Sequence, residues 1–173
     1  TNADFFPMFD VPFAFGGSWS KDDEVHHARV VVISDTLNKR LFEGENSVGR
    51  RIKVKSESFE IVGVLAPWRP QPKFYEVAGG AIMRDSASTF YGKVEDIIMP
   101  FATSVELNRG DFNAWYCWRE PTAGADLTRT SSCLWVQLWV QLPNPEAVAG
   151  YQRFLEGYAG QQRDLGRFDV KPK

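Results

Sequence analysis

The residues that could carry chemistry are few, and they do not form a catalytic group. The histidines at 26 and 27 are adjacent, but neighbouring side chains diverge on both helices and strands, so one metal ion would rarely bind both. The acidic run at 22–24 is more typical of a solvated surface than of a calcium site. The glycine pairs at 16–17 and 79–80 precede no Gly-Lys-Ser/Thr sequence, so neither begins a phosphate-binding loop. The sequence therefore predicts no enzyme, no metal site and no cofactor.

Cys117 and Cys133 are the two cysteines of the chain. In a reducing compartment they would be two unrelated buried thiols, whereas in an oxidising compartment they could pair. The stretch between them is rich in Thr, Ser, Gly and Ala, which is typical of a loop that a disulfide would tether. We favour the disulfide over free thiols. Its Cα atoms would lie about 4.4–6.8 Å apart, and the closed loop would contribute about 3 kcal/mol.

Six tryptophans and an aromatic content of 14% offer apolar surface for binding. Trp135 and Trp139 would lie on one face of a strand, spaced like a partner-docking surface or a stacking platform. Trp115 and Trp118 belong to the same predicted surface, although loop tryptophans can equally cover the ends of a lobe. Three interpretations stay open: a surface for protein partners, a carbohydrate- or ligand-binding module, and a structural domain without a small ligand.

The elements that would position these residues are clearest within 29–65. Four β-branched residues at 30–33 predict a strand that is buried on both faces. Ser34 offers an N-cap for a following helix, on which Leu37 and Leu41 share one face.

A glycine at 44 would end that helix. Alternating polarity at 52–55 predicts a strand with one wet face, and residues 58–65 predict a second, more apolar strand. Upstream, residues 1–20 are aromatic and interrupted by prolines, which should exclude a regular helix and favour an extended, turning segment. The phenylalanines of this segment are predicted to be core anchors.

Residues 134–142, LWVQLWVQL, alternate strictly between aliphatic and Trp/Gln positions, and therefore predict a strand. Asn144 followed by Pro145 predicts the start of a helix of about four turns. A closing strand is expected near 166–170. The predicted helix carries one apolar stripe, formed by Val148, Tyr151, Leu155 and Tyr158.

The bulk composition indicates a folded globular chain. Of its 173 residues 43% are hydrophobic and 24% are charged, and the net charge of -2 gives no general attraction to nucleic acid. No apolar run approaches the roughly 18–20 residues that span a bilayer. A leader with a basic start and an apolar core is not visible either.

Four segments of the chain, taken in order, carry a family resemblance. They are Val-Val-Val-Ile-Ser at 30–34, Leu-Asn-Lys-Arg-Leu-Phe at 37–42, Asn-Ser-Val-Gly-Arg-Arg-Ile at 46–52 and Glu-Ile-Val-Gly-Val-Leu at 60–65. Together they resemble the MacB-like periplasmic core domain, the extracytoplasmic insert of FtsX/MacB-type ABC transporter permeases. The resemblance covers residues 29–65 closely, and residues 5–19 and 136–170 more loosely.

The resemblance implies an α+β fold, with a mixed sheet lobe inserted into a βαβ (porter-like) lobe. Residues 15–130 would form the inserted lobe, and residues 1–14 and 131–173 would form the porter-like lobe. Because the residues before Trp19 are too few and too interrupted by prolines to supply the first half of a porter lobe, we expect that lobe to be incomplete. The strand at 134–142, or its neighbour, would then have an unpaired or self-associating edge.

The resemblance also implies a function without covalent chemistry. The domain would lie on the periplasmic side of the bacterial inner membrane and couple ATP-driven motion of membrane helices to a periplasmic substrate or partner. Its implied partners are an ABC nucleotide-binding subunit or domain, a second permease copy and a periplasmic partner protein, but no nucleic acid. The alternative is an extracytoplasmic carbohydrate- or ligand-binding module that uses exposed tryptophans.

Overall fold

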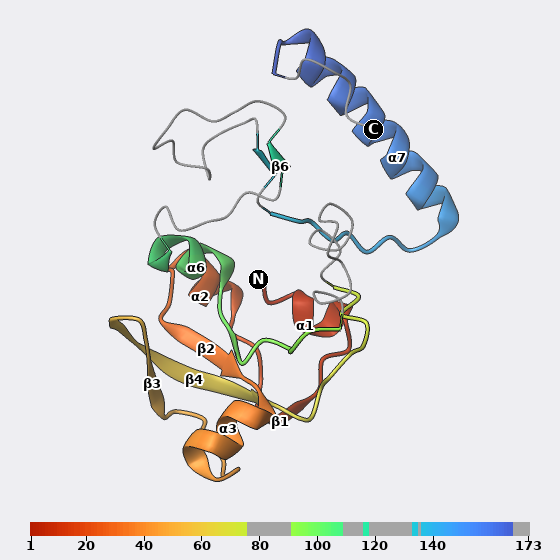
Figure 1. The fold of residues 1–173 in the computed structure, drawn as a ribbon. Helices are drawn as coiled ribbons and strands as arrows, with labels where there is room; N and C mark the ends of the chain where they lie inside the picture. The colour runs from red at the N-terminus through yellow and green to blue at the C-terminus, as the bar shows by residue number, and fades with distance from the viewer. Residues whose placement is uncertain (76–90, 109–115, 118–132, 135, 168–173) are drawn as a thin grey trace. The chain divides into compact units, whose positions relative to one another are not determined.

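The computed structural model describes residues 1–75, 91–108, 116–117, 133–134 and 136–167 (Figure 1). The chain divides into two compact units. The first unit comprises Thr1–Arg109 and the second Gly110–Lys173. This division differs from the predicted one, in which residues 1–14 belonged with the C-terminal part. Among the described helices, none combines the length and the apolar character needed to cross a membrane.

A mixed five-stranded sheet organises the first unit, and it confirms the predicted fold class. The strands are β1 (Phe13–Gly16), β2 (Val30–Ile33), β3 (Arg51–Val54), β4 (Glu57–Leu65) and β5 (Ile97–Ile98). Their order is β1-β4-β2-β5, and β3 also pairs with β4. The long strand β4 pairs antiparallel with β3 along its first half and with β1 along its second half, while β2 lies parallel to it on the other side.

Strand β2 occupies an interior position and is buried on both faces, as its β-branched sequence predicts. Val31, Val32 and Ile33 are completely buried. Successive residues point to opposite faces, so Val31 and Ile33 join a cluster with Phe59 and Ile61, whereas Val32 joins a second cluster on the other face. The sheet therefore has an apolar core on each side.

Helix α3 (Asp35–Phe42) connects β2 to the β3–β4 hairpin and begins where the sequence predicts. The Ser34 side chain accepts a hydrogen bond from the Leu37 backbone N–H at 3.0 Å. Leu37 is buried, but Leu41 is half exposed, so only one of the two leucines faces the core. The helix ends at Phe42, after which Glu43 and Gly44 both adopt positive φ values.

The N-terminal segment differs from two predictions: that residues 1–20 contain no helix, and that residues 1–14 belong to the porter-like lobe. Residues Phe5–Met8 form a single helical turn, α1, that contains a proline; the first N–H groups of a helix have no intrahelical partner, so proline costs little there. Strand β1 then pairs with β4. Phe6 and Val11 are buried beside Trp19, Val32 and Leu65, which places residues 1–14 in the sheet unit because their apolar side chains complete its second core cluster.

Two further helices belong to the first unit. Helix α2 (Lys21–Val25) has a capping box formed by Ser20 and Asp23. Helix α6 (Phe101–Leu107) follows β5 closely along the chain.

The second unit contains the short pair β6 (Tyr116–Cys117) and β7 (Cys133–Leu134) and the helix α7 (Pro145–Asp164). Asn144 caps α7 as predicted, accepting a hydrogen bond from the Ala147 N–H at 2.8 Å, and the helix is longer than the expected four turns. The predicted strand at 134–142 is wrong: β7 ends at Leu134, and residues 136–142 have no regular structure. Alternation alone does not make a strand, because a strand also needs a neighbouring backbone to pair with. The expected strand at 166–170 lies mostly outside the described residues.

Candidate functional site

A groove lies at the carboxyl ends of the parallel strands β2 and β4, beside the start of α3. Its volume is about 290 Å³. Leu65 and Trp68 contribute apolar surface, while Asp35, Asp96, Arg69 and Lys93 contribute charges of both signs. Ligands of sheets with parallel strands commonly bind at the carboxyl ends of those strands, so this groove is the candidate small-ligand site of the first unit.

Ser34 and Asp96 join the two sides of the groove. The Ser34 hydroxyl donates to Asp96 Oδ1 at 2.8 Å, and the Ser34 N–H donates to the Asp96 carbonyl at 3.0 Å. The hydrogen bond from Ser34, followed by the charges of Lys93 and Arg40, holds the pKa of Asp96 below its usual value. A carboxylate with a lowered pKa is a weak base, so this pair does not resemble an activated serine nucleophile.

Asp35 connects α3 to the segment that follows β4. Its carboxylate lies 3.4 Å from Arg69 Nη2 and 3.4 Å from Lys39 Nζ. Arg69 also donates to Thr36 Oγ1 at 3.1 Å. The Asp35 side chain is 10% exposed, while the side chains of both cations are 64% exposed. A buried anion is thus neutralised by side chains that reach in from solvent.

A second polar link holds residues 73–75 to the segment before β5. Lys73 Nζ donates to Glu95 Oε1 at 3.1 Å, and the Tyr75 hydroxyl donates to Glu95 Oε2 at 2.7 Å. The Tyr75 ring stacks on Trp68 with centroids 5.2 Å apart. Glu95 and Asp96 are neighbours in the chain, so one short segment anchors both this link and the Ser34 hydroxyl.

The two histidines lie on the surface of the first unit, and their side chains contact different residues. His26 Nδ1 lies 2.8 Å from the Asp22 carbonyl, and His27 Nδ1 lies 3.3 Å from Glu106 Oε2. Hydrogen bonds from Arg29 and then from His27 lower the pKa of Glu106. Within the part of the chain that the structure describes, no group of three or more His, Cys, Asp or Glu residues is arranged to hold a metal ion.

The predicted partner-docking tryptophans are placed only in part. Trp139 is described and is 40% exposed, whereas Trp115, Trp118 and Trp135 lie outside the described residues. The structure therefore does not test whether these tryptophans form one surface. Of these four tryptophans only Trp139 lies among the described residues, and one exposed ring is not a stacking platform, so the carbohydrate-binding alternative gains no support from them.

The apolar stripe that the sequence predicts on the C-terminal helix lies exposed on α7. We call it the α7 stripe: Val148, Tyr151, Phe154, Leu155 and Tyr158. Phe154 is 61% exposed, and Val148 and Tyr158 are about half exposed at 50% and 48%. The rings of residues 151, 154 and 158 stack in sequence along the helix. Helical periodicity identifies such a stripe but not what covers it, so its exposure is known only from the structure.

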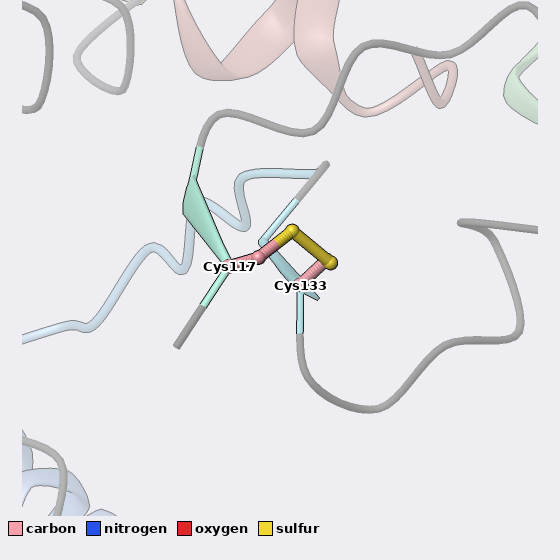
Figure 2. The surroundings of a disulfide bond; sticks show 2 residues. All are labelled: Cys117 and Cys133. Atoms are coloured by element: carbon pink, nitrogen blue, oxygen red, sulfur yellow. A yellow bond between two sulfur atoms is a disulfide. The ribbon is translucent and has the colours of Figure 1, made fainter. Parts of the chain in front are cut away.

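Figure 2 shows Cys117 and Cys133 joined as a disulfide between β6 and β7. The two residues face each other in the antiparallel pair. Their Cα atoms are 4.1 Å apart, slightly less than the range expected from the sequence. Oxidation of the two thiols in the protein stays a prediction that a thiol titration would check.

The mixed sheet of the first unit carries the groove, and the α7 stripe lies exposed in the second unit. The chain belongs to the MacB-like periplasmic core domain family, whose sequence profile matches residues 1–156. It is accordingly a periplasmic domain of the MacB/FtsX type of ABC transporter permease.

Full-length relatives agree with this assignment. The macrolide export ATP-binding/permease protein MacB of Syntrophobacter fumaroxidans is 31% identical over 67 residues, which is 39% of this chain and 9% of that protein. MacB of Wolinella succinogenes is 35% identical over 66 residues, and the pyoverdine export ATP-binding/permease protein PvdT of Pseudomonas aeruginosa is 35% identical over 65 residues; these matches cover 38% of this chain and 10% of each relative. The matched stretch thus spans about a tenth of the length of these relatives.

Two solved structures are similar to the chain. The periplasmic region of MacB from Actinobacillus actinomycetemcomitans superposes with a TM-score of 0.49 at 14% identity, covering 92% of this chain and 55% of that one. The extracellular domain of the ABC-type transporter YknZ from Gram-positive bacteria superposes with a TM-score of 0.36 at 20% identity, covering 38% of this chain and 35% of that one.

Proposed function

We propose that this domain performs no covalent chemistry and passes ATP-driven motion of the permease's membrane helices to a periplasmic partner or substrate. An ABC nucleotide-binding subunit or domain would supply the motion. Membership of the periplasmic core domain family supports this proposal. The proposal includes the location that the family implies, the periplasmic side of the bacterial inner membrane.

The observation that carries the proposal is the exposed α7 stripe. Large apolar side chains that gather on one exposed helix face mark surfaces for protein partners. Phe154 and Leu155 are 61% and 45% exposed, and their transfer from water to a partner surface would contribute up to about 1.5–3 kcal/mol each. A periplasmic partner protein or a second permease copy would supply that surface.

The docking role can be tested in the full-length permease in cells. A photo-crosslinking amino acid at Tyr158 should form a crosslink with a periplasmic partner or with a second permease copy, and Phe154→Glu in the same protein should remove it. The same crosslinker at Arg153, an exposed position that is not part of the α7 stripe, provides the matched control. Equal crosslinking from both positions, or none from Tyr158, would contradict the docking role.

The absence of catalysis has its own test. The purified chain should show no steady ATPase, peptidase or glycosidase turnover. Turnover that a single substitution in this chain abolishes, for example Ser34→Ala or Asp96→Asn in the groove, would overturn this part of the proposal.

A further inference from the structure

Asp35 is a buried carboxylate that lines the groove, and none of the described donors around it makes a short hydrogen bond to it. Its side chain is 10% exposed. The donors that the structure describes around it are Thr36 Oγ1 at 3.3 Å and the cations Lys39 and Arg69 at 3.4 Å. A hydrogen bond between an ionised donor and a carboxylate is ordinarily about 2.7–2.9 Å long. Asp96, which also lines the groove, accepts a shorter hydrogen bond, from the neutral Ser34 hydroxyl at 2.8 Å.

The two cations beside Asp35 are held loosely enough to be displaced. Both cationic side chains are 64% exposed, so water competes with Asp35 for their charges. Arg69 Nη2 contacts both the Asp35 carboxylate and the Thr36 hydroxyl. The chain's own arginine thus shows that a guanidinium can reach this acceptor pair from the solvent side.

The size and walls of the groove limit what else could occupy it. Its volume of about 290 Å³ lies just below the range of roughly 300–1,000 Å³ that holds drug-sized ligands. Leu65 is buried and Trp68 is partly buried along the groove, so an alkyl stem would have apolar contacts. The space suits one small cation with a short stem.

From these contacts we infer that the groove binds a single alkyl-ammonium or guanidinium group, with Asp35 as its counter-ion and Thr36 as a second acceptor. The cation takes the place of Arg69, whose side chain returns to solvent. The cation can come from a free small amine or from a basic side chain of a polypeptide. This site is independent of the α7 stripe and of the proposed function, since it uses only residues of the first unit.

The test is a ¹H–¹⁵N NMR titration of the chain with agmatine, and separately with the amidated tripeptide Gly-Arg-Gly. Neutral n-butylurea serves as the uncharged control. We expect saturable shifts at the backbone amides of residues 34–36, 66, 68, 69 and 71, stronger for the cations than for n-butylurea. The tighter of the two cationic probes identifies the source of the cation. Shifts no larger with either cation than with n-butylurea would overturn the inference.

Three variants make the assignment specific. Asp35→Asn should weaken agmatine binding roughly 10- to 100-fold, the usual range for losing a charged hydrogen bond. Arg69→Ala should tighten it about two- to fivefold, because the internal competitor is gone. Asp22→Asn, an exposed acid outside the groove, should leave it unchanged.

Thermal unfolding of each variant checks that the fold is intact. If Asp35→Asn failed to fold, agmatine binding by Arg69→Ala would still test whether Asp35 is the counter-ion, since this variant leaves Asp35 in place. Weaker binding by Arg69→Ala, or undiminished binding by a folded Asp35→Asn, would show that Asp35 is not the counter-ion.

Discussion

Ser34 donates its hydroxyl proton to Asp96 Oδ1 at 2.8 Å while the same oxygen accepts the Leu37 N–H at 3.0 Å. One side chain thus caps α3 and ties it to the segment that leads into β5. The two residues are 62 positions apart in the chain, so the contact connects local helix formation to the tertiary arrangement of the sheet unit.

Ser34→Ala should destabilise the chain by about 1–2 kcal/mol, because the helix loses its N-cap and Asp96 loses its shortest described donor. Urea unfolding followed by circular dichroism would measure the change. Ser56→Ala is the matched control: this serine is exposed in the β3–β4 turn, and we expect a change within about 0.5 kcal/mol. Equal effects of the two substitutions would contradict the role of Ser34.

The contribution of the Ser34–Asp96 pair should depend on pH. The pKa of Asp96 in the folded chain is lowered, chiefly by the Ser34 hydrogen bond, from an unperturbed value of 3.8. A lowered folded-state pKa gives stability that is fully present above the unfolded pKa and is lost as the pH falls through the folded pKa. The difference in unfolding free energy between the wild type and Ser34→Ala should therefore shrink below about pH 4.

Urea unfolding of both proteins between pH 2.5 and about pH 7 provides the measurement. Lys93→Ala is a useful second variant, since it removes a weaker cause of the same pKa shift and should change the profile less. A difference between wild type and Ser34→Ala that stays constant down to pH 2.5 would exclude the coupling.

Gly63→Ala should destabilise the sheet by about 1–3 kcal/mol, the usual cost of overpacking. A Cβ atom at this position would overlap the Gly17 carbonyl oxygen and lie 2.8 Å from the Phe13 ring, both from the neighbouring β1 region. Gly160→Ala in α7 has open space and should instead stabilise its helix by up to about 1 kcal/mol. Thermal melts that shift in the same direction for both variants would refute this account of Gly63.

Cys117 and Cys133 should be oxidised when the chain is produced in the periplasm. Titration of thiols under denaturing, non-reducing conditions should then find none, and reduction should release two per chain. Reduction of the disulfide, which joins residues 16 positions apart, would remove about 3 kcal/mol of stabilisation from the second unit in the chain-entropy model. Two free thiols before reduction would contradict the pairing, and Cys117→Ser provides the reference for one unpaired thiol.

Local signals in the sequence were enough to predict several helices and strands. Four β-branched residues predict β2, Ser34 predicts the start of α3, and Asn144-Pro145 predicts the start of α7. Caps and periodicity act within a few residues of chain, so they can be read without knowing the partner. The family resemblance within 29–65 lies in the same well-patterned stretch, and the family is confirmed over residues 1–156.

Other features were decided only by tertiary structure, because each depends on residues distant in the chain. Residues 1–14 lie in the sheet unit because Phe6 and Val11 pack in one buried cluster with Trp19 and Leu65, and no local sequence pattern indicates this packing. Residues 136–142 alternate as a strand should, yet lack a described pairing partner and remain irregular. The groove arises in the same way: Asp35 and Asp96 are 61 positions apart, and only the packing of β2 between β4 and β5 brings both carboxylates to one end of the sheet.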